Sequence, residues 1–403
     1  MSLEETNPGE KTLKEVSAEE TKGDYTQTAE TPHSGYHWCN QSERFFEGWY
    51  FRLTLPDPAQ TFAFMYSIDD PAGGTAQSGG AAQILGPDET YYCRTFSDVS
   101  QFWAWLPRLG LGHWRSPSKP SSNNANPRNV AYLPPQVFES DVYEGYQATA
   151  QLHQGQLRLP SGNIQARWHY KVDVVSTWDT PVPRATAGWL SFFPIFEPGW
   201  QVLMAHGLAT GWIEWRMPKP ETASAQGSEL DSELIRYTFE NAPAYAEKNW
   251  GGAFPAKWFW MQCNAFESEP SLSVTAAAGI REVLIFKENV GLIGIHHKGK
   301  YYEFLSTKTQ FSWTVDPWGY WHLSAQNFAH RVVLTGRATD EGAWVRVPTR
   351  DGLQFLCRDT THGHLSLQLW KRGAEDTLIV EANSSLAGLE VGGDPWQEPW
   401  IKQ

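Results

Sequence analysis

Apolar and polar residues alternate along most of the chain from about residue 45 onward. The clearest run extends from Ile164 to Val174, where every second side chain is apolar without a break. Because successive residues of a β-strand point to opposite faces of a sheet, this period predicts a half-buried strand. A similar run covers residues 61–68. The pattern therefore predicts a chain made mainly of β-strands.

Short loops separate two further pairs of such runs, which predicts β-hairpins. The predicted hairpins are 292–296 with 301–305, joined at Lys298–Gly299, and 353–357 with 365–370, joined at His362–Gly363. Helix candidates are few, and the best is the region 99–106, which Pro107 would end. We therefore predict an all-β fold of antiparallel meanders that close into barrels or sandwiches.

Polar stretches at 116–127 and 219–229 are typical of long surface loops. A short internal repeat favours a later domain break, near 267–270. In this repeat, Ala244–Glu247 with Gly251–Gly252 returns as Ala387–Glu390 with Gly392–Gly393. We expect a disordered acidic tail over 1–32, a first β-domain with long loops over 33–268, and a second β-domain over 269–403.

Charge and hydropathy exclude several classes of protein. The 32 Lys and Arg residues against 45 Asp and Glu residues give a net charge of −13, which disfavours nucleic acid as a partner. Mean hydropathy is −0.47, and no stretch approaches the roughly 18 apolar residues that a membrane span needs. Aromatic residues make up 14% of the chain, including 21 Trp. This excess indicates a site for a large apolar or ring-bearing ligand, with carbohydrate as the competing interpretation.

Motifs for common cofactors do not occur. The four cysteines are far apart without a CxxC pair, so we expect buried thiols rather than a zinc site or disulfides. No histidine pair has a third ligand at a recognisable spacing, and neither a P-loop, a G-x-G-x-x-G loop nor a G-x-S-x-G elbow is found. The N-terminal stretch is acidic and has no apolar core, which is unlike a secretory or plastid leader, so we expect a cytoplasmic protein.

One aromatic cluster places a carboxyl group among large rings. In a strand, Tyr245, Glu247 and Asn249 would share one face. An apolar surrounding disfavours the charged carboxylate, so Glu247 would have a raised pKa and act as a proton donor near neutrality. The alternative is that Glu247 pairs with Lys248 or an arginine and only seals a barrel end.

Two other ionisable residues also have a structural and a functional interpretation. His206 lies in an apolar run, where it is either a satisfied core histidine or a catalytic residue. Glu47, next to Trp49 and Tyr50, is expected to anchor a barrel strand.

Long uncommon strings in a consistent order resemble tocopherol cyclases over about residues 33–400. These strings are HSGYHW from His33, FFEGWYF from Phe45, FAFMYSIDDP from Phe62, WQVLMAHGLATGWIEW from Trp200, AYAEKNWG from Ala244, KWFWMQCN from Lys257, CRD from Cys357 and LEVGGDPW from Leu389. The resemblance implies two lipocalin-like (calycin-type) β-domains with a ligand pocket at or near their junction. It also implies closure of the chroman ring of phytylated hydroquinones in vitamin E biosynthesis, without a cofactor or metal.

The resemblance extends to individual residues. In the more distant carotenoid hydratases a Tyr-x-Asp-x-Asn-Trp-Gly-like stretch is associated with alkene protonation, and this chain has Glu247 in place of the aspartate. The implied roles are Glu247 as proton donor, Tyr245 and Asn249 as orienting groups, and His206 as acceptor of the phenolic proton. The implied substrate-binding residues are Trp250, Trp258, Trp260, Trp212, Tyr66 and Trp49.

A phytylated quinol is a lipid, so the resemblance implies peripheral contact with a membrane or lipid droplet. The apolar stretches 103–107 and 192–196 are either a docking rim or core. Two functional alternatives remain at this point. One is a non-catalytic lipocalin-like carrier of prenyl lipids, and the other is an isoprenoid alkene hydratase, in which water captures the cation.

Overall fold

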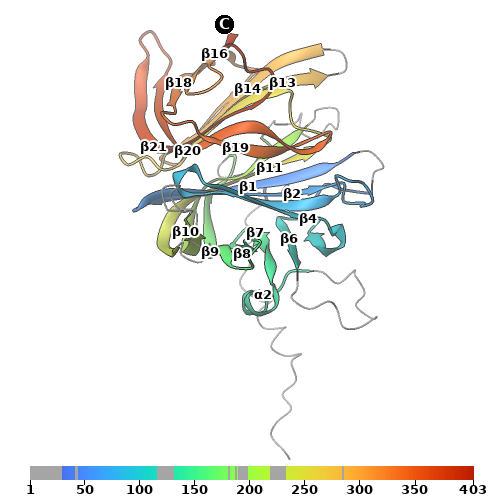
Figure 1. Ribbon diagram of the computed structural model, residues 1–403. Helices are drawn as coiled ribbons and strands as arrows, with labels where there is room; N and C mark the ends of the chain where they lie inside the picture. The colour runs from blue at the N-terminus through green and yellow to red at the C-terminus, as the bar shows by residue number, and fades with distance from the viewer. Residues whose placement is uncertain are drawn as a thin grey trace, which may run out of the picture. The chain divides into compact units, whose positions relative to one another are not determined.

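A computed structural model describes residues 30–40, 44–115, 131–179, 182–186, 188, 198–217, 233–283 and 286–403. Residues Thr31–Gln403 form one compact unit. Two antiparallel sheets of 11 strands make up nearly all of its regular structure (Figure 1). Among the described residues the single α-helix is α2 (Pro135–Asp141). The predicted all-β class is therefore confirmed.

The first sheet contains every strand from β1 to β11, coloured blue to yellow-green in Figure 1. Its order is β4 (Tyr91–Phe96), β3 (Gly79–Leu85), β2 (Ala59–Asp69), β1 (Phe46–Pro56), β11 (Leu234–Gly251), β10 (Gly199–Arg216), β9 (Ile164–Ser176), β8 (Leu152–Arg158), β7 (Glu144–Thr149), β6 (Gly110–Arg115) and β5 (Phe102–Ala104). Most neighbours in this order are also neighbours in the chain, and the main exception is β1, which pairs with β11.

The second sheet contains the strands from β12 onward, coloured yellow to red in Figure 1. Its order is β15 (Lys300–Leu305), β14 (Phe286–His297), β13 (Ser273–Val283), β12 (Lys257–Cys263), β21 (Thr377–Gly393), β20 (Gly352–Lys371), β18 (His330–Arg337), β17 (Tyr320–Gln326), β16 (Gln310–Val315) and β22 (Trp400–Lys402), with β19 (Ala343–Thr349) paired to β20. Here β12 pairs with β21, as β1 pairs with β11 in the first sheet.

Each sheet has its own apolar core. Phe64, Trp168 and Trp215 are buried in the core of the first sheet, and Trp313 and Trp321 in that of the second. Side chains alternate along a strand, so every second side chain of a strand points into the core and the others point to the opposite face of the sheet. For β1, β11 and β12 these other side chains face the junction between the two sheets, where the pocket described below lies.

Several predicted elements are confirmed. The alternating runs form β9 and β2, and the hairpin across Lys298–Gly299 joins β14 to β15. Cys263 and Cys357 are buried thiols, as predicted. Cys39, however, is exposed and Cys93 is half-buried, and neither is in a disulfide bond.

Two predicted elements are wrong. The region 99–106 forms a 3-10 turn, Val99–Gln101, and then β5, because Asp98 caps only one turn and Phe102 and Trp103 pair with β6 instead. The hairpin across His362–Gly363 does not exist, since 352–371 is the single strand β20. Its register with β21 shifts at Gly363, so this stretch is a bulge that keeps the strand direction rather than a turn that reverses it.

The chain passes from the first sheet to the second between Gly251 and Lys257. The domain limit at 268 stays a prediction, with β12 already part of the second sheet. The predicted tail up to residue 29, the two polar loops and the stretch 192–196 lie outside the described residues. None of the helices in the described part of the chain has the length and apolar character needed to span a membrane.

Candidate active site

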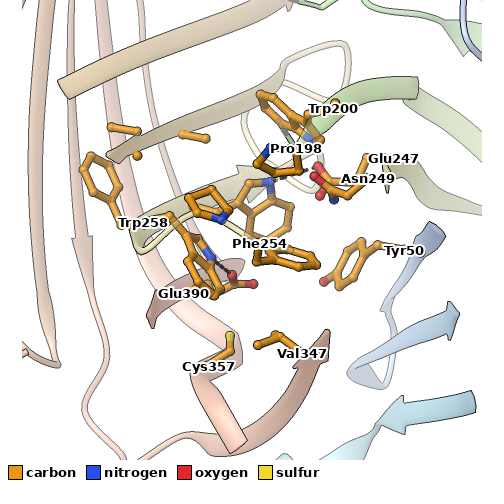
Figure 2. Close-up of a pocket in the computed structure, with 18 of the residues that line it drawn as sticks. Tyr50, Pro198, Trp200, Glu247, Asn249, Phe254, Trp258, Val347, Cys357 and Glu390 are labelled. Carbon is orange, nitrogen blue, oxygen red and sulfur yellow. Dashed lines mark hydrogen bonds between the residues drawn. The ribbon is translucent and has the colours of Figure 1, made fainter. Parts of the chain in front are cut away.

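A pocket of about 310 Å³ lies between the two sheets. Its walls come from β1, β2, β3, β10 and β11 of the first sheet and from β12, β13, β14, β15, β19, β20 and β21 of the second, and Figure 2 shows part of them. Most of the lining is aromatic or aliphatic, and its charged residues are Glu247, Glu288, Glu390 and Arg346. The lining residues used below are Tyr50, Trp200, Glu247, Asn249, Phe254, Trp258, Trp260, Cys357 and Glu390. Such a pocket, apolar with a few polar groups, is typical of a small-molecule site.

Strand register places Glu247 on the pocket face of β11. It pairs with Tyr50 of β1 on one side and with Val202 of β10 on the other. Residues paired across an antiparallel ladder lie on the same face, so Glu247 and Tyr50 both face the second sheet. Asn249, two residues further on, also lines the pocket, and Tyr245 is buried beside Glu247. The structure thus brings together the three residues that alternation predicts for one face.

Only neutral donors contact the Glu247 carboxyl group among the described residues. Its Oε2 accepts a hydrogen bond of 2.6 Å from the Tyr245 hydroxyl and one of 3.1 Å from Nε1 of Trp260. Burial raises the pKa of Glu247 from 4.5 to about 7, although hydrogen bonds from Tyr245, Trp200 and Trp260 oppose this rise. A carboxyl group with this pKa is protonated in about half of the molecules near neutral pH and can donate a proton there.

Lys248 does not pair with Glu247, which was the structural alternative. Its ammonium group points to the other face of β11, where it forms a buried ion pair with Glu47. The backbone N–H of His37 donates a 2.9 Å hydrogen bond to the second oxygen of Glu47. Glu47 therefore has the anchoring position expected for it, away from the pocket.

The second wall of the pocket carries two tryptophans of β12. Trp258 and Trp260 are two residues apart and so share a face, and both are nearly fully buried. Nε1 of Trp258 donates a hydrogen bond to Glu390 on β21, which Figure 2 draws as a dashed line. Gly392 allows this arrangement, because a Cβ atom at that position would overlap the Trp258 ring.

Glu390 occupies the same place in the second sheet as Glu247 in the first. Glu247 lies on β11 opposite a residue of β1, and Glu390 lies on β21 opposite Trp260 of β12. The short internal repeat aligns these two glutamates. The sequence reasoning used that repeat only to place a domain break, so it missed Glu390 as a site residue. It also missed Trp200 and Tyr50, although both belong to aromatic clusters that it singled out.

Two of the predicted substrate-binding residues, Trp250 and Trp212, do not line the pocket. Trp49 and Tyr66 are among its lining residues, and their rings also belong to the core of the first sheet, where Tyr66 stacks on Tyr146 at 3.9 Å between ring centroids. Trp250 is stacked on His37 at 4.0 Å. Trp212 lies beneath the guanidinium group of Arg236, 4.2 Å from its ring centroid, and does not line the pocket.

His206, the predicted acceptor of the phenolic proton, is buried in β10 but does not line the pocket. Burial lowers its pKa. Within the described ranges, no group of three or more His, Cys, Asp or Glu residues is placed to hold a metal ion.

Comparison with solved structures bears on the fold. The crystal structure titled "Crystal structure of CghA with Sch210972" is similar over 91% of this chain and 96% of that one, with a TM-score of 0.50 and 10% sequence identity. At this identity the likeness concerns the fold alone, and it agrees with the predicted lipocalin-like architecture of two β-units.

Two curated relatives are much closer in sequence. A protein of Oryza sativa subsp. japonica named "Probable tocopherol cyclase, chloroplastic" is 41% identical over 399 residues, covering 92% of this chain and 80% of the relative. A Zea mays protein named "Tocopherol cyclase, chloroplastic" is 40% identical over 399 residues, covering 92% and 79%. The family model described as "Tocopherol cyclase-like" matches residues 43–393. This chain therefore belongs to the tocopherol cyclase-like family.

Proposed function

We propose that this protein is a cofactor-independent tocopherol cyclase, an isomerase that closes the chroman ring of phytylated hydroquinones. Its substrates would be 2,3-dimethyl-6-phytyl-1,4-benzoquinol, giving γ-tocopherol, and 2-methyl-6-phytyl-1,4-benzoquinol, giving δ-tocopherol. The observation that carries the proposal is Glu247, a buried acid with a pKa of about 7 in an aromatic pocket of a chain that is about 40% identical to named tocopherol cyclases.

In this proposal Glu247 starts the reaction by protonating the alkene. The side-chain double bond takes the carboxyl proton, and the positive charge develops at the adjacent tertiary carbon. Tyr245 and Trp260 hold the carboxyl group in place through their hydrogen bonds to Oε2. Asn249, on the same face of β11, is placed to orient the quinol ring.

The aromatic walls have two roles in the proposed mechanism. The faces of Trp200, Trp258 and Phe254 supply negative π-density that stabilises a cation, by about 2 kcal/mol or more for each desolvated ring. They also exclude water, which would otherwise capture the cation as a tertiary alcohol. The phenol oxygen is then the nucleophile that attacks, and the ring closes.

The proposal is tested by incubating the purified protein with reduced dimethyl-phytyl-benzoquinol in detergent and D₂O, without added cofactor. We expect a single chromanol enantiomer with one carbon-bound deuterium, detected by chiral chromatography and mass spectrometry. Unchanged quinol bound to folded protein would indicate a prenyl-lipid carrier instead. A tertiary alcohol would indicate an isoprenoid alkene hydratase.

We also propose that the protein is cytoplasmic. We further propose that it makes peripheral contact with a membrane or lipid droplet, since the phytyl chain of this substrate is a lipid. In the stretch 103–107, Leu106 is 69% exposed and is available for such contact, whereas Trp103 is buried with Trp114 and Phe138. Both relatives are named as chloroplastic. Flotation with neutral-lipid vesicles tests the contact, and Leu106→Glu should reduce it.

A further inference from the structure

The proposed ring closure moves two protons, and Glu247 accounts for only one of them. The alkene gains a proton, and the attacking phenol hydroxyl must lose one. His206, the acceptor predicted from the sequence, does not line the pocket. The group that receives the phenolic proton has to be found among the polar side chains that do.

We propose that Glu390, assisted by the Tyr50 hydroxyl, binds the attacking phenol hydroxyl of the quinol and accepts its proton as the ring closes. This inference rests on the proposed function. It makes Glu247 and Glu390, one from each sheet, an acid and a base.

The first observation is the way in which β12 holds both carboxyl groups. Trp260 donates its indole N–H to Glu247 at 3.1 Å, and Trp258 donates its own to Glu390. The two tryptophans are two residues apart on one rigid strand that is paired on both sides. The two carboxyl groups are therefore held in a fixed relation to each other on the walls of one pocket, as an acid and a base of the same reaction require.

The second observation concerns the charge around Glu390. Asp359 of β20 lies opposite it in the ladder. Asp359 is buried and Glu390 is half-buried at the pocket wall, so ionisation of one disfavours ionisation of the other. Glu390 is stabilised as a carboxylate by donors from Trp258 and Cys357, whereas no described side chain donates a hydrogen bond to Asp359. Asp359 is thus the member of the pair that keeps a proton, and Glu390 is the one that ionises.

Other charged groups near the pair support this assignment. The buried guanidinium group of Arg52 favours one negative charge in the pair, while Glu89 and Glu247 disfavour a second. Burial raises the pKa of Glu390, so its carboxylate is a stronger base than an exposed glutamate. This is the property that an acceptor of a phenolic proton requires.

The third observation is the Tyr50 hydroxyl. Tyr50 is half-buried, its ring lies 5.3 Å from that of Trp260, and its enclosed hydroxyl oxygen has no hydrogen-bond partner among the described residues. The charges of Asp359, Arg52, Glu390 and Glu247 all act on it, so it lies near both pocket glutamates that the proposal uses and near Asp359 and Arg52. A buried hydroxyl group normally has a partner, and the quinol oxygen would supply one here.

The proposed step balances in atoms and charge. The alkene π-pair takes the proton of Glu247 and forms a C–H bond, the phenol oxygen forms the C–O bond to the tertiary carbon, and the phenolic O–H bond breaks. Its proton passes to the Glu390 carboxylate. Glu247 is left ionised and Glu390 protonated, and return of the proton to Glu247 restores the enzyme.

The test compares the same substitution at the two equivalent strand positions, Glu390→Gln and Glu247→Gln, with dimethyl-phytyl-benzoquinol in D₂O. In Glu390→Gln we expect chromanol formation to fall at least ~100-fold, the usual contribution of a general base. Alkene protonation continues in this variant and reverses, so recovered quinol should contain carbon-bound deuterium. In Glu247→Gln the recovered quinol should contain none.

Two results with Glu390→Gln would overturn the proposal. One is chromanol formation within threefold of the wild-type rate. The other is loss of chromanol without deuterium in the recovered quinol, from protein that is folded and binds quinol. A wild-type protein that forms no chromanol would instead reject the proposed function, which keeps the two failures distinct.

If Glu390→Gln does not fold, the proposal is tested with Tyr50→Phe, because this substitution removes only the hydroxyl group that has no partner among the described residues. We expect KM for the quinol to rise and kcat to fall, with kcat/KM reduced about tenfold, as for loss of one hydrogen bond to substrate. Unchanged kcat and KM in Tyr50→Phe would remove this residue and the hydroxyl-binding site from the mechanism.

Discussion

Two buried glutamates lie on opposite faces of the same pair of strands, β1 and β11, and they differ in what surrounds them. Glu47 faces away from the pocket and is paired with the buried ammonium group of Lys248. Glu247, the neighbour of Lys248 in the chain, faces the pocket and receives hydrogen bonds only from neutral groups of the described residues. The first carboxyl group has a full positive charge beside it, whereas neutral donors leave the second able to exchange a proton near pH 7. The partner, rather than burial alone, separates a structural carboxyl group from a reactive one.

The largest expected effect is on catalysis at Glu247. Glu247→Gln keeps the shape and the hydrogen-bond acceptor but removes the transferable proton, so kcat should fall at least ~1,000-fold, or about 4 kcal/mol in activation free energy. The free energy of unfolding should change by no more than about 1 kcal/mol, because no charged partner is left behind. Steady-state kinetics and urea denaturation check both values. A variant with more than a tenth of wild-type activity would remove Glu247 as the donor.

Lys248→Met should mainly reduce stability, whereas Glu247→Gln should mainly reduce catalysis. Lys248→Met leaves Glu47 buried without its cation, and breaking a buried ion pair in this way costs about 3–5 kcal/mol. The double variant Glu47→Gln with Lys248→Met removes both charges and should recover most of this loss. Urea denaturation of the two variants measures the difference. A loss below about 1 kcal/mol in Lys248→Met would mean that the pair contributes little, and the contrast between the two faces would fail.

A smaller effect is expected in the pH dependence. The pKa of Glu247 is about 7 in the folded protein and 4.5 in an exposed glutamate, so between these values the folded state retains a proton that the unfolded state has released. Stability contributed by Glu247 is therefore complete below pH 4.5 and is lost as pH rises toward 7. Relative to Glu247→Gln, the wild type should lose stability across this window, and its kcat should decline above about pH 7. The free energy of unfolding of both proteins is measured as a function of pH. If the difference between them does not change from pH 4.5 to 7, the raised pKa of Glu247 is contradicted.

The smallest effect is expected at Trp250. Its ring stacks on His37 on the Glu47 side of β11, so Trp250→Phe should keep kcat and KM for the quinol within about threefold of wild type. Steady-state kinetics on dimethyl-phytyl-benzoquinol measures this. A much larger loss would show that the two faces of β11 are coupled, and it would support the role that the sequence resemblance gives to this residue.

Alternation of side chains made much of the site predictable. It places Tyr245, Glu247 and Asn249 on one face, and in the structure Glu247 and Asn249 line the pocket while Tyr245 donates a hydrogen bond to Glu247. What alternation cannot predict is which strands of a second sheet lie opposite that face. Glu390 is 143 positions after Glu247 in the chain, and only the pairing of β12 with β21 brings it to the pocket.

The errors have physical causes of the same kind. His362–Gly363 has the composition of a turn, but a bulge in a long strand uses the same residue types, and only cross-strand pairing distinguishes them. The resemblance to tocopherol cyclases marks whole strings, and such a string includes residues on both faces of its strand. Glu247 and Lys248 are adjacent, yet the first lines the pocket and the second pairs with Glu47 on the other face of the strand.

The equivalent positions of Glu247 and Glu390 have an evolutionary consequence. In a symmetric homodimer built from one such sheet, every substitution would occur twice, and the two carboxyl groups would remain identical. A single chain that carries both sheets can change one half of the pocket alone. Here Glu247 lies opposite a tyrosine, and Glu390 lies between a tryptophan and an aspartate. A single chain thus allows residues at equivalent strand positions of its two sheets to have different surroundings.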